Sequence, residues 1–417
     1  MNKISYESFT LDNGLKVIVH EDSSIPFAVM DILYRVGSKD EQEHRTGFAH
    51  LFEHLMFEGS KHIPNYDRPL QRVGGQNNAF TTADITNYYL SLPSNQLETG
   101  FWLESDRMLE LAFSQEKLDI QKSVVIEEYK QRYLNQPYGD AHLKLRALHY
   151  DTHPYKWPTI GKDISHVEDA TLDEVKDFFF SFYAPNNATL IVAGDVKVDQ
   201  VKALCEKWFG PIESRELKKR VLPQEGPQQA AKEMTVHAEV PYAAIYKMFH
   251  VPAHTERGYY VADIITDLLF NGKSALLFQS LVKDKKVSPQ VNAYSWGLHH
   301  PGVVSIDGRV AEGVSLKTYE DALAESLEKI QELTEEDLDR IKGKLEASFV
   351  MQQTRLLSKT MTLAISDSLG DVDLINTTPE IYQGIQLDEV KAAAAQYLAP
   401  ENCSTLYYLP ENYVASA

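Results

Sequence analysis

The sequence predicts an α+β protein built from two related halves of about 200 residues each. A chain of 417 residues exceeds what one hydrophobic core normally supports, so we expect roughly two to four domains or subdomains. Segments with strand-like alternation are mixed with segments of helical periodicity. A helix-turn-strand unit also occurs twice, which indicates an internal duplication.

The first half mixes predicted strands and helices. Residues 6–11 and 15–20 flank an Asp-Asn-Gly turn and therefore predict a β-hairpin. Further strands are predicted where Thr, Tyr and aliphatic residues concentrate, at residues 27–36, 78–82, 86–91 and 188–193. Helical periodicity predicts helices at residues 97–112, 114–132 and 172–182.

The repeated unit relates the two halves to each other. Asp-Glu-Val-Lys at residues 173–176, followed by Ala-Pro-Asn-Asn at 184–187, recurs 215 residues later as Asp-Glu-Val-Lys at 388–391 and Ala-Pro-Glu-Asn at 399–402. In both copies a predicted helix leads through the Ala-Pro-x-Asn turn into a predicted strand. The match has no gap between its two ends, so duplication is favoured over a chance similarity.

A polar segment separates the halves. Residues 211–235 contain three prolines and a glycine among charged residues, which is the composition of a linker. We therefore expect an N-terminal domain at residues 1–210, a linker at 211–235 and a homologous C-terminal domain at 236–417.

Composition limits the possible partners. The formal net charge of −19 argues against binding to nucleic acid or to anionic membranes, because their phosphates would be repelled. Cys205 and Cys403 are the only cysteines, which excludes a cysteine-rich zinc site. The N-terminus lacks the apolar stretch of a signal peptide and no run of 18 apolar residues is present, so a cytoplasmic location is expected.

Residues 50–54 read His-Leu-Phe-Glu-His and predict a metal site. On a helix, His50, Glu53 and His54 project from one face. Two neutral imidazoles at this spacing can share one Zn²⁺, and the carboxylate can take a proton from the water that the metal activates. In a chain with 14 histidines the spacing also arises by chance, and such a pair is often only solvated.

The residues around this motif favour the metal over that alternative. Thr46 is a candidate N-cap and Gly59 can close the C-terminus of the helix. The remaining positions are largely apolar: Phe48, Leu51, Phe52, Leu55, Met56 and Phe57. Placing two histidines and a glutamate in so apolar a helix costs several kcal/mol unless they have a partner, and a metal is such a partner.

A third ligand has to come from another segment, since a catalytic zinc usually has three protein ligands and one open position. Residues 124–130 read Val-Val-Ile-Glu-Glu-Tyr-Lys, an apolar run that ends in two carboxylates. Adjacent helical residues point about 100° apart, so either Glu127 or Glu128 can face the histidines, but not both. The alternative for each is an ordinary solvated glutamate.

The ordered set of motifs along the whole chain resembles the pitrilysin/insulinase family of zinc peptidases. The subgroup it resembles most consists of short two-domain bacterial members and mitochondrial processing peptidase subunits. The segments that carry the resemblance are Leu11–Val17, His50–His54, Gly74–Gly75, Asn78–Thr81, Val124–Glu128, Phe182–Leu190 and Gly194–Asp195.

The resemblance implies a site. Glu128 becomes the third ligand of one Zn²⁺ per chain, with Glu53 as the general base. Gln121 stands where family members carry a glutamate, which weakens any supporting electrostatic role there. An extended peptide or unfolded polypeptide would add to an exposed sheet edge at Asn78-Ala79-Phe80. Each half would be a mostly antiparallel sheet packed by helices, and the halves would face each other across a central cavity.

The second half departs from the pattern of catalytic members. They carry an Arg and a Tyr that steady the substrate and the oxyanion, but here Leu276 and Pro289 occupy those places. Loss of an oxyanion donor costs about 10²–10³ in rate. One interpretation is a zinc-bearing subunit of a homo- or heterodimer whose homologous partner supplies the Arg/Tyr pair. The alternatives are a weak peptidase acting alone with another donor, such as Tyr294, and a non-catalytic structural or regulatory subunit.

Overall fold

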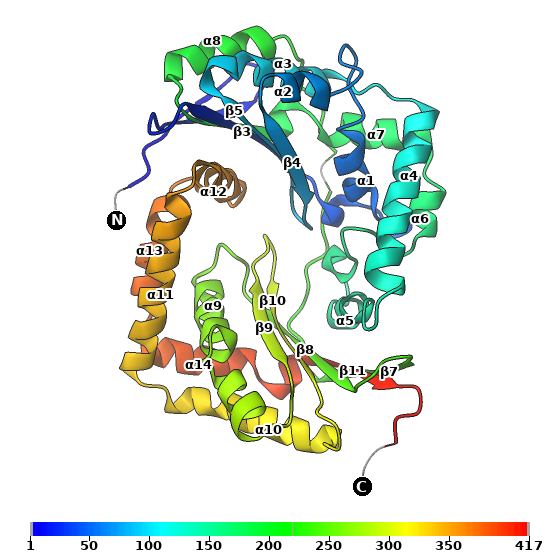
Figure 1. The fold of residues 1–417 in the computed structure, drawn as a ribbon, viewed down its shortest axis with the longest axis vertical. Helices are drawn as coiled ribbons and strands as arrows, with labels where there is room; N and C mark the ends of the chain where they lie inside the picture. Colours follow the sequence, from blue (N-terminus) through cyan, green and yellow to red (C-terminus); the bar gives the residue numbers. More distant parts are fainter. Residues whose placement is uncertain (1–2, 219, 415–417) are drawn as a thin grey trace. The chain divides into compact units, whose positions relative to one another are not determined.

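The computed structural model describes residues 3–218 and 220–414, and the chain divides into two compact units (Figure 1). The first unit comprises the chain up to Tyr129 together with Trp157–Leu222 and Phe349–Thr377. The second comprises Lys130–Lys156, Pro223–Ser348 and the chain from Thr378 onward. The chain passes from the first unit to the second between Leu222 and Pro223, within the predicted linker. Two shorter segments, Lys130–Lys156 and Phe349–Thr377, belong to the opposite unit from the residues on either side of them.

The sheet of the first unit has the strand order β1-β2-β6-β3-β5-β4. Within it β2 and β6 run parallel, and the other neighbouring strands run antiparallel. The predicted hairpin is confirmed as the β1–β2 pair. The strands span Glu7–Thr10 (β1), Lys16–Glu21 (β2), Phe27–Tyr34 (β3), Gln76–Thr81 (β4), Thr86–Pro93 (β5) and Ala188–Gly194 (β6).

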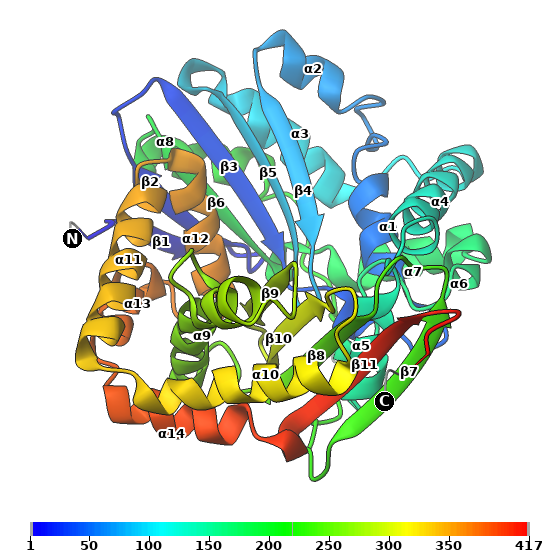
Figure 2. The same cartoon turned by 60° about the horizontal axis from the view of Figure 1, so that its bottom comes forward.

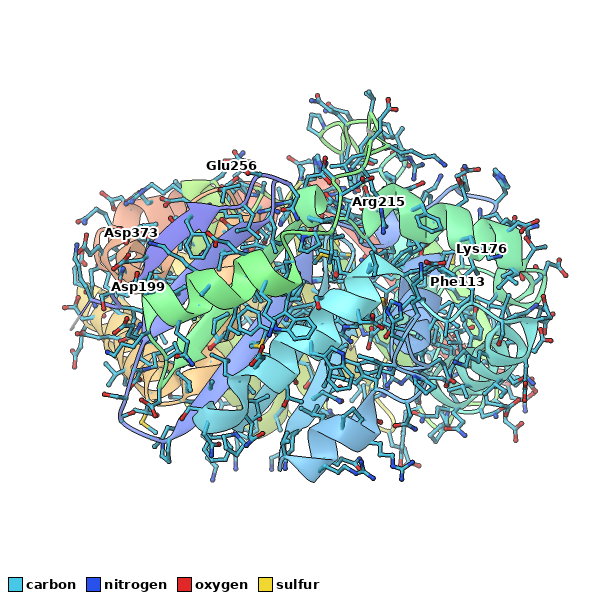
Figure 3. All side chains as sticks on the ribbon, turned by 90° about the horizontal axis from the view of Figure 1, so that it is seen from above. Phe113, Lys176, Asp199, Arg215, Glu256 and Asp373 are labelled. Atoms are coloured by element: carbon cyan, nitrogen blue, oxygen red, sulfur yellow. The ribbon has the colours of Figure 1, made fainter. Side chains whose placement is uncertain are left out.

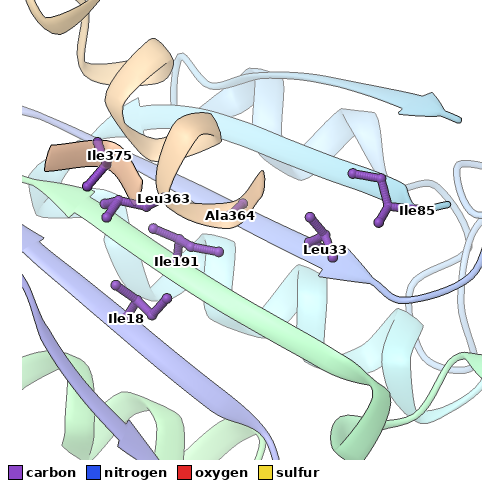
Figure 4. Close-up of a cluster of buried hydrophobic side chains, with 7 residues drawn as sticks. All are labelled: Ile18, Leu33, Ile85, Ile191, Leu363, Ala364 and Ile375. Atoms are coloured by element: carbon purple, nitrogen blue, oxygen red, sulfur yellow. The ribbon is translucent and has the colours of Figure 1, made fainter. Parts of the chain in front are cut away.

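Helices cover both faces of this sheet. On one face α3 and α8 lie side by side (Figure 3). On the other face α12 packs against β3 and β6, and Leu363 and Ala364 of α12 join Leu33 and Ile191 in a buried cluster (Figure 4). The helices of the unit span Phe48–Leu55 (α1), Asp67–Arg72 (α2), Leu97–Leu109 (α3), Gln115–Tyr129 (α4), Ser165–Glu168 (α6), Leu172–Phe182 (α7), Val198–Trp208 (α8) and Leu356–Ser368 (α12).

The sheet of the second unit has the order β7-β11-β8-β10-β9, with β7 and β11 parallel and the other neighbours antiparallel. Helix α5 packs against β11 and β8, and α9 packs against β9 and α14. The strands span Lys232–Ala238 (β7), Ala244–Val251 (β8), Val291–Trp296 (β9), Gly302–Arg309 (β10) and Cys403–Pro410 (β11). The helices span Ala141–His149 (α5), Arg257–Phe270 (α9), Leu316–Glu328 (α10) and Leu387–Tyr397 (α14).

Three helices lie across boundaries between the units or end at one. Helix α4 ends at Tyr129 and continues as a π-helical segment, Lys130–Leu134, in the second unit. Glu335–Gln353 (α11) and Leu374–Gln383 (α13) each contain a boundary. None of the helices in the described part of the chain is long and apolar enough to cross a membrane.

The two sheets share one topology, which confirms two homologous halves. The parallel pair β2–β6 corresponds to β7–β11, and β3, β5 and β4 correspond in order to β8, β10 and β9. Helix α7 at Leu172–Phe182 and helix α14 at Leu387–Tyr397 begin and end 215 residues apart. The fold class predicted from the repeat is therefore correct, with α1 of the first half in the position of α9 in the second.

Candidate metal centre

Helix α1 is fixed by a buried apolar surface and by a carboxylate at its N-terminus. Its residues Phe48, Leu51 and Phe52 are buried. The buried Glu41 accepts hydrogen bonds from the backbone N–H groups of Gly47 (3.0 Å) and Ala49 (2.8 Å). Two of the N–H groups that lack a helical partner at a helix start are thereby satisfied. Burial raises the pKa of Glu41 to about 8, although these N–H groups favour its charged form.

The predicted N-cap at Thr46 is wrong. Gly47 occupies the N-cap position, with a φ of 91° that favours glycine. The Thr46 hydroxyl instead accepts a hydrogen bond from the backbone N–H of Lys162 at 2.9 Å. The helix also ends at Leu55, before the Gly59 that was expected to close it. A distant glutamate has therefore taken the role expected of the local threonine, which local sequence could not reveal.

The structure brings His50, His54 and Glu128 together. Glu128 lies on α4, which packs against α1 (Figure 2). Its Oε2 atom is 3.6 Å from Nε2 of His50 and 3.6 Å from Nε2 of His54. Among the residues that the structure describes, these three make up the group of His, Cys, Asp or Glu side chains whose ligand atoms lie within 4.8 Å of one another. The geometry thus selects Glu128 rather than Glu127 from the two alternatives.

This donor set fits a zinc ion. Two imidazole nitrogens and one carboxylate oxygen form a common protein ligand set for catalytic zinc. Ligand atoms bound about 2.1 Å from one ion at tetrahedral angles lie about 3.4 Å apart, which is close to the 3.6 Å separations measured here. All three side chains are half-buried, so solvent or a substrate can still reach the site.

Glu53 lies beside this group and is bonded to the edge strand. Its Oε2 atom accepts a hydrogen bond from the Thr81 hydroxyl at 2.7 Å. The buried phenols of Tyr88 and Tyr183 lie close enough to feel its charge: burial raises the pKa of both, and the charge of Glu53 raises it further. No role for Thr81 was predicted from the sequence.

Although Gln121 itself carries no charge, its side chain is hydrogen-bonded to a nearby carboxylate, that of Glu58. Its Nε2 atom donates a hydrogen bond to Oε1 of Glu58 at 2.5 Å. Glu58 follows the C-terminus of α1, and Lys117 on α4 donates to its backbone oxygen at 2.6 Å. These two bonds hold the segment that follows α1 against α4.

The segment predicted to bind substrate is in the edge strand β4. Asn78 is exposed and Ala79 is half-buried. Phe80 packs against the hydrophobic cluster of Figure 4, so its ring serves the core of the unit. The backbone N–H of Ala79 donates to Oδ1 of Asn78 at 2.8 Å, so this N–H is not committed to the β5 ladder.

Leu276 and Pro289, which the resemblance places where an Arg and a Tyr are expected, both lie in the second unit. Leu276 is half-buried and Pro289 is exposed, and neither side chain carries a donor. Tyr294 lies on β9 of the same unit, and its hydroxyl is 3.3 Å from Nδ1 of His142.

Two family models match the chain. The model described as "Insulinase (Peptidase family M16)" matches residues 16–161, the range that holds His50, Glu53, His54 and Glu128. The model described as "Peptidase M16 inactive domain" matches residues 169–345.

Similar proteins include named zinc proteases. "Zinc protease PqqE" from Helicobacter pylori is 27% identical over 415 residues, covering 97% of this chain and 93% of the relative. "Uncharacterized zinc protease YmxG" from Bacillus subtilis is 24% identical over 355 residues, covering 84% and 85%.

Solved structures share the fold. A protease from Helicobacter pylori superposes with a TM-score of 0.91 at 26% identity, covering 97% of this chain and 100% of that one. The periplasmic protease PqqL from Escherichia coli gives a TM-score of 0.79 at 19% identity, and here 98% of this chain covers only 48% of the other. The latter likeness shows the fold alone.

Proposed function

Because the chain belongs to the insulinase (M16) family of peptidases, we propose that it is a zinc-dependent peptidase that hydrolyses bonds in extended or unfolded polypeptides. The single observation that carries the proposal is the convergence of His50, His54 and Glu128 from two helices on one point. The names of the similar zinc proteases support it.

In this proposal His50, His54 and Glu128 hold one Zn²⁺ per chain. A zinc ion bound there would polarise a peptide carbonyl and lower the pKa of a water molecule to about 7. Glu53 takes the proton from the attacking water and delivers it to the leaving amine. Its position on α1, one residue before the proposed ligand His54, supports this role.

The substrate is proposed to pair with β4. The strand is at the edge of its sheet, and a peptide can add to such an edge through main-chain hydrogen bonds that do not depend on sequence. Within the segment Asn78-Ala79-Phe80, the backbone of Ala79 would supply such bonds, because its N–H is not committed to β5. The N–H of Ala79 is bonded to the Asn78 side chain, so a substrate carbonyl would replace Asn78 Oδ1 there.

A homologous partner is proposed to complete the site. Leu276 and Pro289 cannot supply the Arg/Tyr pair, so in this proposal a second, homologous chain brings it. The double length of some structural neighbours supports pairing of this fold: the chain covers 48% of PqqL and 46% of pitrilysin. The "inactive domain" description of the model at residues 169–345 favours the second candidate, a non-catalytic subunit.

The test combines metal analysis with one substitution. The purified protein is expected to contain about one zinc per chain by elemental analysis, and to cleave unfolded casein or a quenched fluorescent peptide mixture. Glu53→Gln is expected to retain the zinc and lose at least about 10²-fold in rate, because the amide cannot accept the proton. Glu127→Gln is the matched control, because Glu127 is exposed and is not part of the group that could hold a metal.

Two results would overturn the proposal. Absence of zinc after reconstitution would remove its basis. Peptidase activity in Glu53→Gln equal to that of the unmodified protein would show that Glu53 is not the base.

A further inference from the structure

We infer that Thr81 is a positioning residue that fixes the orientation of the Glu53 carboxylate and links it to the edge strand β4. The inference rests on the proposed function, since it concerns the group proposed there as the base. The contact that carries it is the hydrogen bond from Thr81 Oγ1 to Glu53 Oε2 at 2.7 Å, which joins the last residue of β4 to the last turn of α1.

The direction of the Thr81 side chain follows from the alternation of side chains along β4. Side chains alternate between the two faces of a strand, so Asn77, Ala79 and Thr81 share one face. Asn77 confirms which face this is, since its Nδ2 atom donates to Oδ1 of Asp67 on α2 at 2.8 Å. Phe80 projects to the opposite face and packs into the cluster beneath α12. Thr81 therefore lies on the face of β4 opposite Phe80, and from there its hydroxyl reaches Glu53 of α1.

Thr81 is also suited to hold a carboxylate rigidly. Its branched Cβ restricts the first side-chain torsion, so the hydroxyl has few alternative directions. Glu53 by contrast has a long side chain with several rotamers, and it is only half-buried. A neutral donor at 2.7 Å selects among these rotamers without placing a second charge beside the metal ligands. Displacement of a catalytic group by about 1 Å can cost 10²-fold in rate, so this selection matters.

The link also ties the base to the strand proposed to carry the substrate. Thr81 lies two residues after Ala79 on the same face of β4. The strand β4 would therefore position both the proposed substrate and the Glu53 carboxylate. Sites held by strands and helices are positioned more accurately than sites held by loops.

The test compares Thr81→Val, which keeps the shape but removes the hydroxyl, with Thr81→Ser, which keeps the hydroxyl. In the zinc-loaded protein Thr81→Val is expected to lower kcat by about 10- to 100-fold with KM within about two-fold, because only the orientation of the base changes. Thr81→Ser is expected to restore most of kcat. Zinc content and melting temperature should be unchanged in both.

A second readout does not depend on activity. Crystal structures of the metal-free proteins are expected to show one orientation of the Glu53 carboxylate in the unmodified protein and in Thr81→Ser, but several in Thr81→Val. Asn77→Ala is the matched control, since it removes another bond from the same face of β4 to a helix. If Thr81→Val does not fold, Thr81→Ala takes its place in both comparisons.

The outcomes separate this inference from the proposed function. An active unmodified protein together with an unchanged kcat in Thr81→Val overturns the inference and leaves the function standing. Equal losses in Thr81→Val and Thr81→Ser also overturn it, because the hydroxyl would then not matter. If the unmodified protein has no peptidase activity, the proposed function fails, while the crystal structures still decide whether Thr81 orders Glu53.

Discussion

At the scale of single residues, three glutamates near the histidine pair have different surroundings. Glu128 faces both imidazoles, Glu53 is bonded to the Thr81 hydroxyl, and Glu58 is bonded to the Gln121 amide. The chemistry available to each follows from its neighbours rather than from its residue type. Glu128 can share a cation with the histidines, whereas Glu53 keeps a neutral neighbour and can act on a proton.

Glu128→Ala is expected to weaken zinc binding by at least about 10²-fold, because it removes one of three ligands. Glu127→Ala is expected to bind zinc as the unmodified protein does, since helical geometry turns the neighbouring side chain about 100° away. Competition with a chromophoric chelator measures both affinities. Equal zinc affinity in the two variants would contradict the assignment of Glu128.

These residues show which parts of the site could be predicted from the sequence alone. The spacing within residues 50–54 was sufficient to place His50 and His54 on one face of a helix. The choice between Glu127 and Glu128 needed either the family resemblance or the structure, because the rotation of α4 about its axis depends on its packing. Thr81 has no local signal of its own, since its partner is 28 residues away in sequence.

At the scale of elements, the central strand β3 contains an unusual buried acid. Asp31 is fully buried between β5 and β6, and its Oδ2 atom accepts a hydrogen bond from Nδ2 of Asn87 at 3.0 Å. Burial, helped by the charge of Glu104 on α3, raises the pKa of Asp31 to about 8, although the hydrogen bond from Asn87 lowers it in part. The side chain is therefore neutral in the folded protein at neutral pH, although it ionises in the unfolded chain.

This acid makes the first unit less stable as the pH rises. Above pH 4 the unfolded chain loses the Asp31 proton while the folded protein keeps it up to about pH 8, so the stabilising contribution declines across this range. The slope is at most about 1.4 kcal/mol per pH unit for one group. Asp31→Asn cannot titrate, so its melting temperature relative to the unmodified protein is expected to rise between pH 5 and pH 8.5. A constant difference across that range would show that Asp31 is ionised in the folded protein.

Elements were predicted well where their signal is local. The α7–β6 unit and its copy α14–β11 were found because turn residues and hydrophobic periodicity lie within one short segment. The start of α1 was predicted wrongly because Glu41, six residues before Gly47, supplies the acceptor that Thr46 was expected to supply. A cap that comes from outside the helix leaves no pattern at the helix itself.

At the scale of the whole molecule, the division of the chain was the hardest feature to predict. Residues 349–377 lie between strands β10 and β11 of the second sheet in sequence, yet they belong to the first unit. Asp367 of α12 accepts bonds from Lys16 and Arg35 at 2.5 Å each, and Leu363 joins the core beneath β3. These partners lie more than 300 residues apart, beyond any local pattern. The boundaries 1–210 and 236–417 stay a prediction about the duplicated halves.

One chain alone is expected to hold an incomplete active site. Leu276 and Pro289 stand where a substrate-steadying Arg and Tyr are expected, so the chain alone is expected to turn over peptide slowly. A homologous chain that carries the Arg and Tyr should raise kcat/KM by about 10²–10³, the usual contribution of an oxyanion donor. The measurement is peptidase activity of each chain alone and of the purified mixture, with replacement of the partner's Arg as control. If the chain alone is fully active and Tyr294→Phe abolishes that activity, the donor lies within the chain and no partner is needed.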